Sequence, residues 1–290
     1  MRNEIILTYD GTLAPSQFVS LRTLSYTLPH LQRAIDKTVY FQERSDLRKY
    51  TSLPEELHVH ADLYFNEVIR GSLRIPFISE LLEGVPELFT KILENPYERA
   101  AGEVEVRRGL LRTDLEITKE HARLDNLEGR TQEDVVREER KHKLDYARSA
   151  VLHDVNNLLS VVRSDEGAII SLSTDTQKLG YREFYFDRSR AYKFSKITNT
   201  KRLADPVIYT GKIKGVEEQR NNSMFKYAAK FLSSHTNQES KLLIADIDDA
   251  LKISAHNLKD ENVVFWGAPI ALFDAFDPVR GDVVFIDFIS

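Results

Sequence analysis

The chain from Pro206 to its end is the part whose pattern most restricts the fold. Apolar and β-branched residues form five short runs there, separated by turn residues: VIYTGKIKGV, SMFKYAAKFL, KLLIADI, NVVFWGAPIAL and DVVFIDF. Runs of this composition are typical of strands. The stretch DIDDALKISAHNL has the spacing of a helix and lies between the third and fourth runs. Three strands, a helix and two strands is the order of a five-stranded OB barrel, so we expect an OB-like barrel here.

The N-terminal part of the chain predicts a small sheet covered by helices. Residues Glu4–Tyr9 form an apolar run that ends at an Asp-Gly turn, as a strand does. Within Phe18–Val39, apolar residues recur every three or four positions, which predicts a helix. The period becomes two in Leu57–Phe65, and Arg70–Ile78 repeats it, so we expect a hairpin that reverses near Gly71.

Charged helices are expected to follow this sheet. Residues Ile78–Leu93 are amphipathic, and the Asn95-Pro96 step is expected to end their helix. Charge dominates residues 101–148, where Thr131 and Asp134 resemble a capping box that restarts a helix. The first part of that helix, EDVVREERKHK, has almost no apolar stripe. We therefore expect this end to project into solvent or to dock on a partner.

These patterns predict two domains and an α+β fold. The first domain covers residues 1–164 and contains the small helix-covered sheet and the long charged helices. The second covers residues 165–290, where AIISLS and YREFYF add strands ahead of the barrel. The fold class is therefore α+β, a helix-covered sheet followed by a β-rich, OB-like barrel domain.

Composition limits the functions that the chain can have. Its formal net charge is −5, so binding to nucleic acid would require a local basic patch. Cysteine is absent, which excludes disulfides, thiolate metal sites and cysteine nucleophiles. No run approaches the roughly 20 apolar residues of a membrane span, and the N-terminus lacks the pattern of a signal peptide. We expect a cytoplasmic protein that does not bind a membrane and needs no cofactor.

The sequence HVHAD raises the question of a metal-dependent hydrolase. On a strand, His58 and His60 would project from one face about 7 Å apart, close enough to share one metal ion. Asp62 would lie about 13 Å from His58 on an extended strand, too far to join them. No other histidine has a recognisable ligand spacing. The alternative is the wet face of an antiparallel strand, or an interface.

A basic and aromatic segment, residues 178–202, offers a second site. Eight lysines and arginines stand there against two acids, with six aromatic residues between them. Cations that neutralise phosphates beside rings that stack on bases are the components of single-strand recognition. The candidate ligand-binding residues are Arg182, Arg188, Arg190, Lys193 and Lys196, with Tyr185 and Tyr192 as stacking rings. The alternatives are charge matching within the chain or between subunits, and plain surface.

The barrel region carries the opposite charge balance. From Pro206 onward, twelve acidic residues outnumber nine basic ones. Such a module would repel a phosphate backbone unless its positive residues all lay on one face. The barrel is therefore interpreted as a scaffold or a protein-docking domain.

Part of the N-terminal region resembles a family of uncharacterised bacterial proteins. The likeness covers residues 5–77 and lies in LTYDGTLAPSQFVSLRTLSYTLPHLQRAI and ADLYFNEVIRGSLRIPF. In that family a strand and a glycine turn precede a helix, and a hairpin ends in the Gly-Ser-hydrophobic step seen here at Gly71-Ser72-Leu73. This chain has one glycine at the first turn where the family tends to have two. The resemblance implies no activity, but its style is that of accessory proteins of bacterial mobile-element or antiviral defence loci.

Three functions remain open from the sequence. The first is a binding or accessory subunit of a bacterial complex, because no set of catalytic residues is complete. Its partner would be another protein or a second copy of this chain. The second is binding of nucleic acid or a nucleotide through residues 178–202, and the third is a metal-dependent hydrolase that uses His58 and His60. We expect a binding protein rather than an enzyme.

Overall fold

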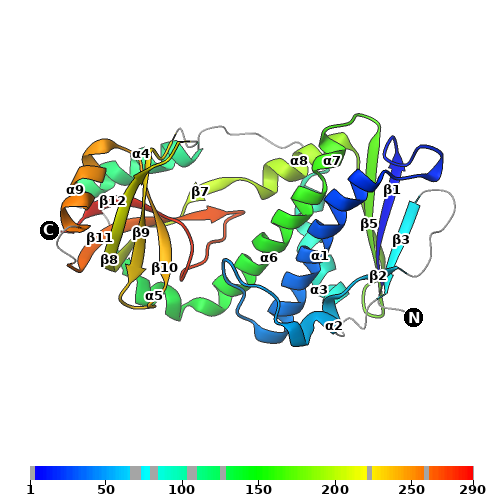
Figure 1. Ribbon diagram of the computed structural model, residues 1–290, viewed down its shortest axis with the longest axis horizontal. Helices are drawn as coiled ribbons and strands as arrows, with labels where there is room; N and C mark the ends of the chain where they lie inside the picture. The colour runs from blue at the N-terminus through cyan, green and yellow to red at the C-terminus, as the bar shows by residue number, and fades with distance from the viewer. Residues whose placement is uncertain are drawn as a thin grey trace. The chain divides into compact units, whose positions relative to one another are not determined.

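The computed structural model of this protein describes residues 4–65, 73–78, 84–102, 110–124, 129–220, 224–257 and 261–289 (Figure 1). The fold is mixed α+β and contains a closed five-stranded barrel, as the sequence predicts. The chain forms two compact units. The first consists of Met1–Val106 and Ala147–Asn199, and the second of Arg107–Tyr146 and Thr200–Ser290.

This division corrects the expected domain boundary after residue 164. Strand β1 (Glu4–Gly11) pairs with β5 (Ala168–Thr176) along its whole length, and β6 (Gly180–Phe186) pairs with β5. The first sheet is therefore completed by segments from beyond residue 164. Because strand pairing joins segments far apart in the sequence, local composition does not reveal where a unit ends.

The sheet of the first unit has the order β2-β3-β1-β5-β6. Its other strands are β2 (Tyr64–Phe65) and β3 (Leu73–Ile78), which form a short antiparallel hairpin as expected. The expected reversal at Gly71, and Ser72 of the family resemblance, lie outside the described residues. Alternate residues of β1, including Ile5, Leu7 and Tyr9, are fully buried, so this central strand anchors the core.

Helices cover one face of this sheet (Figure 1). Their bounds, with the short 3₁₀ turns, are η1 (Pro15–Gln17), α1 (Leu21–Arg44), η2 (Glu55–Leu57), α2 (His58–Ala61), α3 (Val85–Arg99), α6 (Glu139–Leu158), α7 (Ser160–Arg163) and α8 (Arg188–Thr198). Ser20 caps α1, and its side chain accepts a hydrogen bond from the backbone of Thr23. The first part of α6, through Tyr146, belongs to the second unit.

Two helices differ from their predicted limits. Helix α3 begins at Val85 rather than at Ile78, which ends β3, and it continues through Pro96 to Arg99. Proline inside a helix costs about 3 kcal/mol. Pro96 is itself buried together with Phe89 and other apolar residues of α3, and this burial offsets the cost.

The predicted strand at the paired histidines is wrong. Residues His58–Ala61 form the helix α2, directly after the 3₁₀ turn η2 that follows Pro54. Leu57 and Ala61 are buried four positions apart, which is a helical spacing. The alternating pattern is therefore also compatible with one short helical turn, and packing selects the helix.

The second unit contains the barrel. Its strands are β8 (Val207–Glu218), β9 (Tyr227–Ser233), β10 (Glu239–Ile244), β11 (Val263–Leu272) and β12 (Val283–Phe288). They follow the order β8-β9-β10-β12-β11, and pairing of β8 with β11 closes the barrel. Strands β10 and β12 are parallel, and α9 (Ile247–Asn257) connects β10 to β11. This is the predicted order of an OB-like barrel, filled by rings such as Phe231, Phe265 and Phe285.

Helix α4 (Leu110–Arg123) packs on the outside of the barrel. Its Leu115 contributes to an apolar cluster with residues of four barrel strands. Lys119 forms ion pairs with Asp246 and Asp249, at 2.9 and 2.5 Å. The barrel carries two short additional strands, β4 (Arg130–Thr131) and β7 (Lys201–Leu203).

Helix α5 (Gln132–Arg137) follows β4 and confirms the predicted capping box. The hydroxyl of Thr131 accepts a hydrogen bond from the backbone of Asp134, whose carboxylate accepts one from the backbone of Thr131. The expected long helix is divided here, because α5 ends before Glu138 and α6 follows as a separate helix. Within the described ranges, no helix has the length and apolar character needed to cross a bilayer.

Candidate functional site

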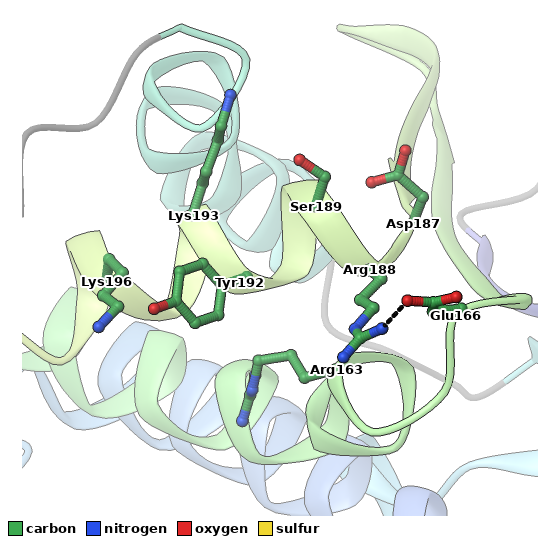
Figure 2. A pocket seen from close by; sticks show the side chains of 8 residues that line it. All are labelled: Arg163, Glu166, Asp187, Arg188, Ser189, Tyr192, Lys193 and Lys196. Carbon is green, nitrogen blue, oxygen red and sulfur yellow. Dashed lines mark hydrogen bonds and ion pairs between the residues drawn. The ribbon is translucent and has the colours of Figure 1, made fainter.

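The first unit contains a cavity of about 700 Å³ between α8 and the end of α7 (Figure 2). The cavity is open to solvent and bears charged side chains from α7, from the loop that follows α7, and from α8 with its capping residue. Its lining residues are Arg163, Glu166, Asp187, Arg188, Ser189, Tyr192, Lys193 and Lys196. Six of these eight side chains carry a charge, and four of those are cations.

Helix α8 places a stripe of functional side chains along the cavity. Asp187 caps the helix, and its carboxylate accepts a hydrogen bond of 2.7 Å from the backbone of Arg190. One face of α8 is buried through Ala191, Phe194 and Ile197. The opposite face carries Arg188, Tyr192 and Lys196, spaced four residues apart. Residues at this spacing lie above one another on a helix, so the ring stands between two cations.

Two of the cavity's acidic groups are already engaged. The carboxylate of Glu166 forms an ion pair of 2.6 Å with Arg188, although both side chains are largely exposed. An exposed pair of this kind contributes less than about 1 kcal/mol. The carboxylate of Asp187 accepts a hydrogen bond from the backbone at the N-terminal end of α8. Because the lining has four cations and two carboxylates, its net charge stays positive.

Arg163 is the cation that stands out. It is the last residue of α7, and its Nη1 donates hydrogen bonds of 2.9 Å to the carbonyl oxygen and Oδ1 of Asn156, a buried residue. No carboxylate in the described part of the chain forms an ion pair with it. Burial lowers the pKa of the Arg163 guanidinium, an effect that nearby Tyr26 opposes. A half-buried cation without a counterion is costly, and a bound anion would offset that cost.

Tyr192 supplies an aromatic surface next to these cations. Its ring is 51% exposed, and the Nζ atom of Lys196 lies 4.8 Å from the ring centroid. Figure 2 shows the ring above Arg163, with Arg188 on one side and Lys196 on the other. An exposed ring flanked by cations can stack on a base or another planar group.

The structure divides the predicted ligand-binding residues into two groups. Arg188, Tyr192, Lys193 and Lys196 line the cavity, although Lys193 points to the other side of α8 and donates to the carbonyl oxygen of Gly102 at 2.9 Å (Figure 2). The others lie elsewhere in the first unit: Arg182 and Tyr185 on β6, and Arg190 against α3.

Arg190 and Tyr185 are placed away from the cavity by specific contacts. The guanidinium of Arg190 lies over the ring of Tyr97 at 4.3 Å and donates to its hydroxyl at 2.6 Å. Tyr185 stands between the buried Phe184 and Phe186 on β6, so its side chain points to the opposite face of the sheet. Contacts within the first unit therefore hold Arg190 away from the cavity, and strand alternation does the same for Tyr185.

Sequence reasoning missed Arg163 because it lies outside the basic segment and reaches the cavity only through folding. It also missed helix α8. The signal was present, since Asp187 is a good capping residue and Ala191, Phe194 and Ile197 recur at helical spacing. The predicted strand YREFYF ends at Phe186, as β6 does, but no element was predicted for the residues of α8.

The helical conformation of α2 argues against a metal site at His58 and His60. His58 and His60 stand two positions apart on α2, where successive residues turn by about 100°, so their side chains point in different directions. A ring nitrogen of His58 lies 3.3 Å from the carbonyl oxygen of Leu53. Across the described residues, no group of three histidine, aspartate or glutamate side chains could hold a metal ion.

No family model matches this chain, and no similar protein was found among curated proteins or solved structures. The resemblance of residues 5–77 to uncharacterised bacterial proteins stays a prediction. The geometry of the cavity therefore carries the functional interpretation.

Proposed function

We propose that this protein is a non-catalytic binding protein whose α8 cavity holds a small phosphorylated ligand of the nucleotide class. The observation that carries the proposal is Arg163, a half-buried cation that faces the cavity and has no carboxylate partner among the described residues. Such a group favours an anion delivered from solvent.

Phosphate is the anion that fits this arrangement best. A guanidinium presents a planar fork of donors that matches phosphate oxygens. The described hydrogen bonds of Arg163 involve Nη1 alone, and Asn156 fixes that end of the group. The remaining donors are available to a ligand, and Arg188 and Lys196 add positive charge nearby.

The size and lining of the cavity favour a nucleotide over a long nucleic acid. Sites for small ligands usually have volumes of about 300–1,000 Å³, and this cavity falls within that range. Tyr192 provides one exposed ring, which suits one base. A strand of nucleic acid would need a series of such rings along a groove.

The lining supports binding rather than catalysis. It supplies cations, a ring and the hydroxyl of Ser189, and its two carboxylates are engaged by Arg188 and by the end of α8. Within this lining, no base is hydrogen-bonded to a nucleophile, which is the arrangement that covalent catalysis uses.

The test is isothermal titration calorimetry of the full chain with ATP, ADP, adenosine and pyrophosphate at about 50 mM salt. ATP and ADP should bind, and adenosine should bind much more weakly. Arg163→Gln should lower the ATP affinity at least tenfold, because hydrogen bonds to charged groups contribute about 1.5–3 kcal/mol. The matched control is Arg112→Gln on α4, an exposed arginine paired with Glu116, which should bind ATP like the wild type.

Two results would contradict the proposal. One is a wild-type protein that binds none of the phosphorylated compounds at millimolar concentration. The other is equal ATP binding by Arg163→Gln and the wild type when both have the same circular dichroism spectrum and melting temperature.

Docking to another protein is a second candidate function. Phe18 follows η1, and Leu21 is the first residue of α1. The two are 78% and 80% exposed, which is unusual for large apolar side chains. Native mass spectrometry of the wild type and of Phe18→Ser/Leu21→Ser tests this candidate. An oligomer that dissociates in the double variant would support it, and a monomer with no captured protein would count against it.

A further inference from the structure

Three lysines lie side by side on the outer face of the barrel. In the register of the sheet, Lys214 of β8 is opposite Lys230 of β9, and Lys230 is opposite Lys241 of β10. All three side chains are exposed. The neighbouring residues Ala229 and Phe231 of β9 belong to the barrel core, so Lys230 points outward. We call these three residues the lysine row.

This arrangement is unfavourable unless something neutralises it. Like charges directly opposite each other in a sheet are destabilising, and the lysine row contains two such pairs. No carboxylate in the described ranges forms an ion pair with Lys214 or Lys230. Lys241 donates to the side-chain oxygen of Gln219 at 2.9 Å, which is a neutral partner.

Protection of a sheet edge does not explain the lysine row. Lysines on edge strands prevent aggregation by blocking strand addition. Strand β9, however, is paired on both sides, with β8 and with β10, and the barrel is closed. The lysines therefore stand on an interior strand and its two neighbours. None of these three described strands is an edge of the closed barrel, so the lysines have no edge to protect.

The register also changes the interpretation of the barrel's charge. Acidic residues outnumber basic ones in this region, so a phosphate backbone would be repelled unless the cations shared a face. The strand pairing places three of the nine basic residues on one face, which makes a local positive strip on a barrel of net negative charge. Glu217 of β8 is opposite Ala228 and Glu239 of β10 is opposite Leu232, each two positions from Lys230 in the register, and the two carboxylates limit the width of the lysine row.

We infer that the lysine row binds the phosphodiester backbone of a nucleic acid. Neighbouring strands lie about 4.8 Å apart, and each strand of DNA carries one phosphate per about 3.4 Å of rise, so successive ammonium groups can meet successive phosphates. On β9, the outward neighbours of Lys230 are Ala228 and Leu232, which are not aromatic. Without a stacking ring, the contact is with phosphates and does not depend on base sequence.

A bilayer fits the lysine row less well. Recognition of anionic lipid typically uses clusters of four to eight basic residues, often beside exposed apolar anchors. The lysine row has three cations and is flanked by half-buried Leu232 and by the acidic residues named above. The inference is independent of the α8 cavity, because it uses other residues, in the other compact unit.

The experiment measures fluorescence anisotropy of labelled oligo(dT) and of a labelled duplex with the full chain over a range of salt concentrations. The double variant Lys214→Gln/Lys230→Gln removes two cations of the lysine row. For single strands it should lower affinity about 25-fold at about 0.1 M salt and reduce the slope of log affinity against log salt by about 1.4, because each phosphate contact contributes about 0.7. The duplex arm shows whether double strands share the contact.

The matched control is Lys201→Gln/Lys252→Gln, which removes two exposed lysines of the same unit outside the lysine row. It should bind oligo(dT) like the wild type. Equal loss in the control, or no loss in Lys214→Gln/Lys230→Gln, would overturn the inference. So would a wild-type chain that binds neither nucleic acid at low salt, or one that binds phosphatidylserine vesicles through the lysine row instead.

Discussion

The two compact units of this protein treat their positive side chains in different ways. In the first unit, most cations near α8 are held by partners from other elements, such as Glu166, Tyr97 and Gly102. In the second unit, the lysine row stands exposed on the barrel without ion-pair partners in the described ranges. The cations of the first unit line an open cavity, and those of the second form a row on the outer face of the barrel.

The two arrangements suit different ligands. The cavity is organised before binding, because Asn156 holds Arg163 and helix α8 positions Arg188 and Lys196. This favours a compact ligand with one defined pose. A strip of flexible lysines on a sheet has no fixed pose and suits a linear polyanion with repeating charge. Substitutions in each region separate these two modes of binding.

The largest effect on stability is expected at Asp154, a buried carboxylate of the first unit that is surrounded by cations. Asp154 of α6 is 3% exposed and lies 3.2 Å from Nε of Arg33 and 2.6 Å from Nζ of Lys37, both on α1. Asp154→Asn leaves these cations without their counterion and should cost about 3 kcal/mol in the free energy of unfolding, measured in urea.

The control for that measurement is Glu166→Gln, which breaks an exposed pair and should cost less than about 1 kcal/mol. Equal costs for the two variants would mean that the first unit does not depend on buried pairing. Pairing of cations in the first unit would then make no measurable contribution to the free energy of unfolding, contrary to the difference from the lysine row that we expect.

The next effect concerns the ring in the cavity. Tyr192→Ala should weaken ATP binding by about 2 kcal/mol, the usual contribution of one stacked base, whereas Tyr192→Phe keeps the ring and should bind ATP like the wild type. Oligo(dT) binding should not change in either variant, because Tyr192 and the lysine row belong to different units. Loss of both activities in Tyr192→Ala would show that the two regions are not independent.

A smaller effect should appear as a pH dependence of the first unit alone. Burial, and then the nearby Arg33, lower the pKa of His30 from its ordinary value of 6.5. The folded state therefore binds this proton less tightly than the unfolded state, so stability should fall as the pH decreases through 6.5 toward the lowered pKa. His30→Asn should flatten the curve of unfolding free energy against pH in this window, and an unchanged curve would contradict the assignment.

The smallest effect tests the repulsion in the lysine row. Lys230→Gln removes the central charge and should stabilise the protein by a few tenths of a kcal/mol at low salt. The gain in melting temperature should disappear at about 1 M salt, where charges are screened within about 3 Å. A destabilised variant would mean that Lys230 has a partner that stabilises the fold.

Local pattern predicted much of this fold. The five barrel strands, helix α9 and the capping box at Thr131 were all visible in the sequence, because each depends on residues close together in the chain. The HVHA segment was misassigned because four residues fit either period. Packing of Leu57 and Ala61 decides for a helix there, and a short window of sequence does not contain that information.

The candidate sites were less predictable than the elements that carry them. The sequence located the basic segment and four of the residues that line the cavity, but not Arg163, which comes from another helix. It also counted the lysines of the barrel without showing that three of them share a row.

Residue pattern was sufficient for the order of the strands and helix in the barrel and for the expectation of an OB-like barrel, since alternation and turn residues act over a few positions. Folding of the whole chain pairs β1 with β5, brings Arg163 to the cavity beside α8, and makes Lys214, Lys230 and Lys241 neighbours. The physical reason is that strand register and helix packing are set by contacts between distant segments. Such contacts bring together charges that the linear order keeps apart.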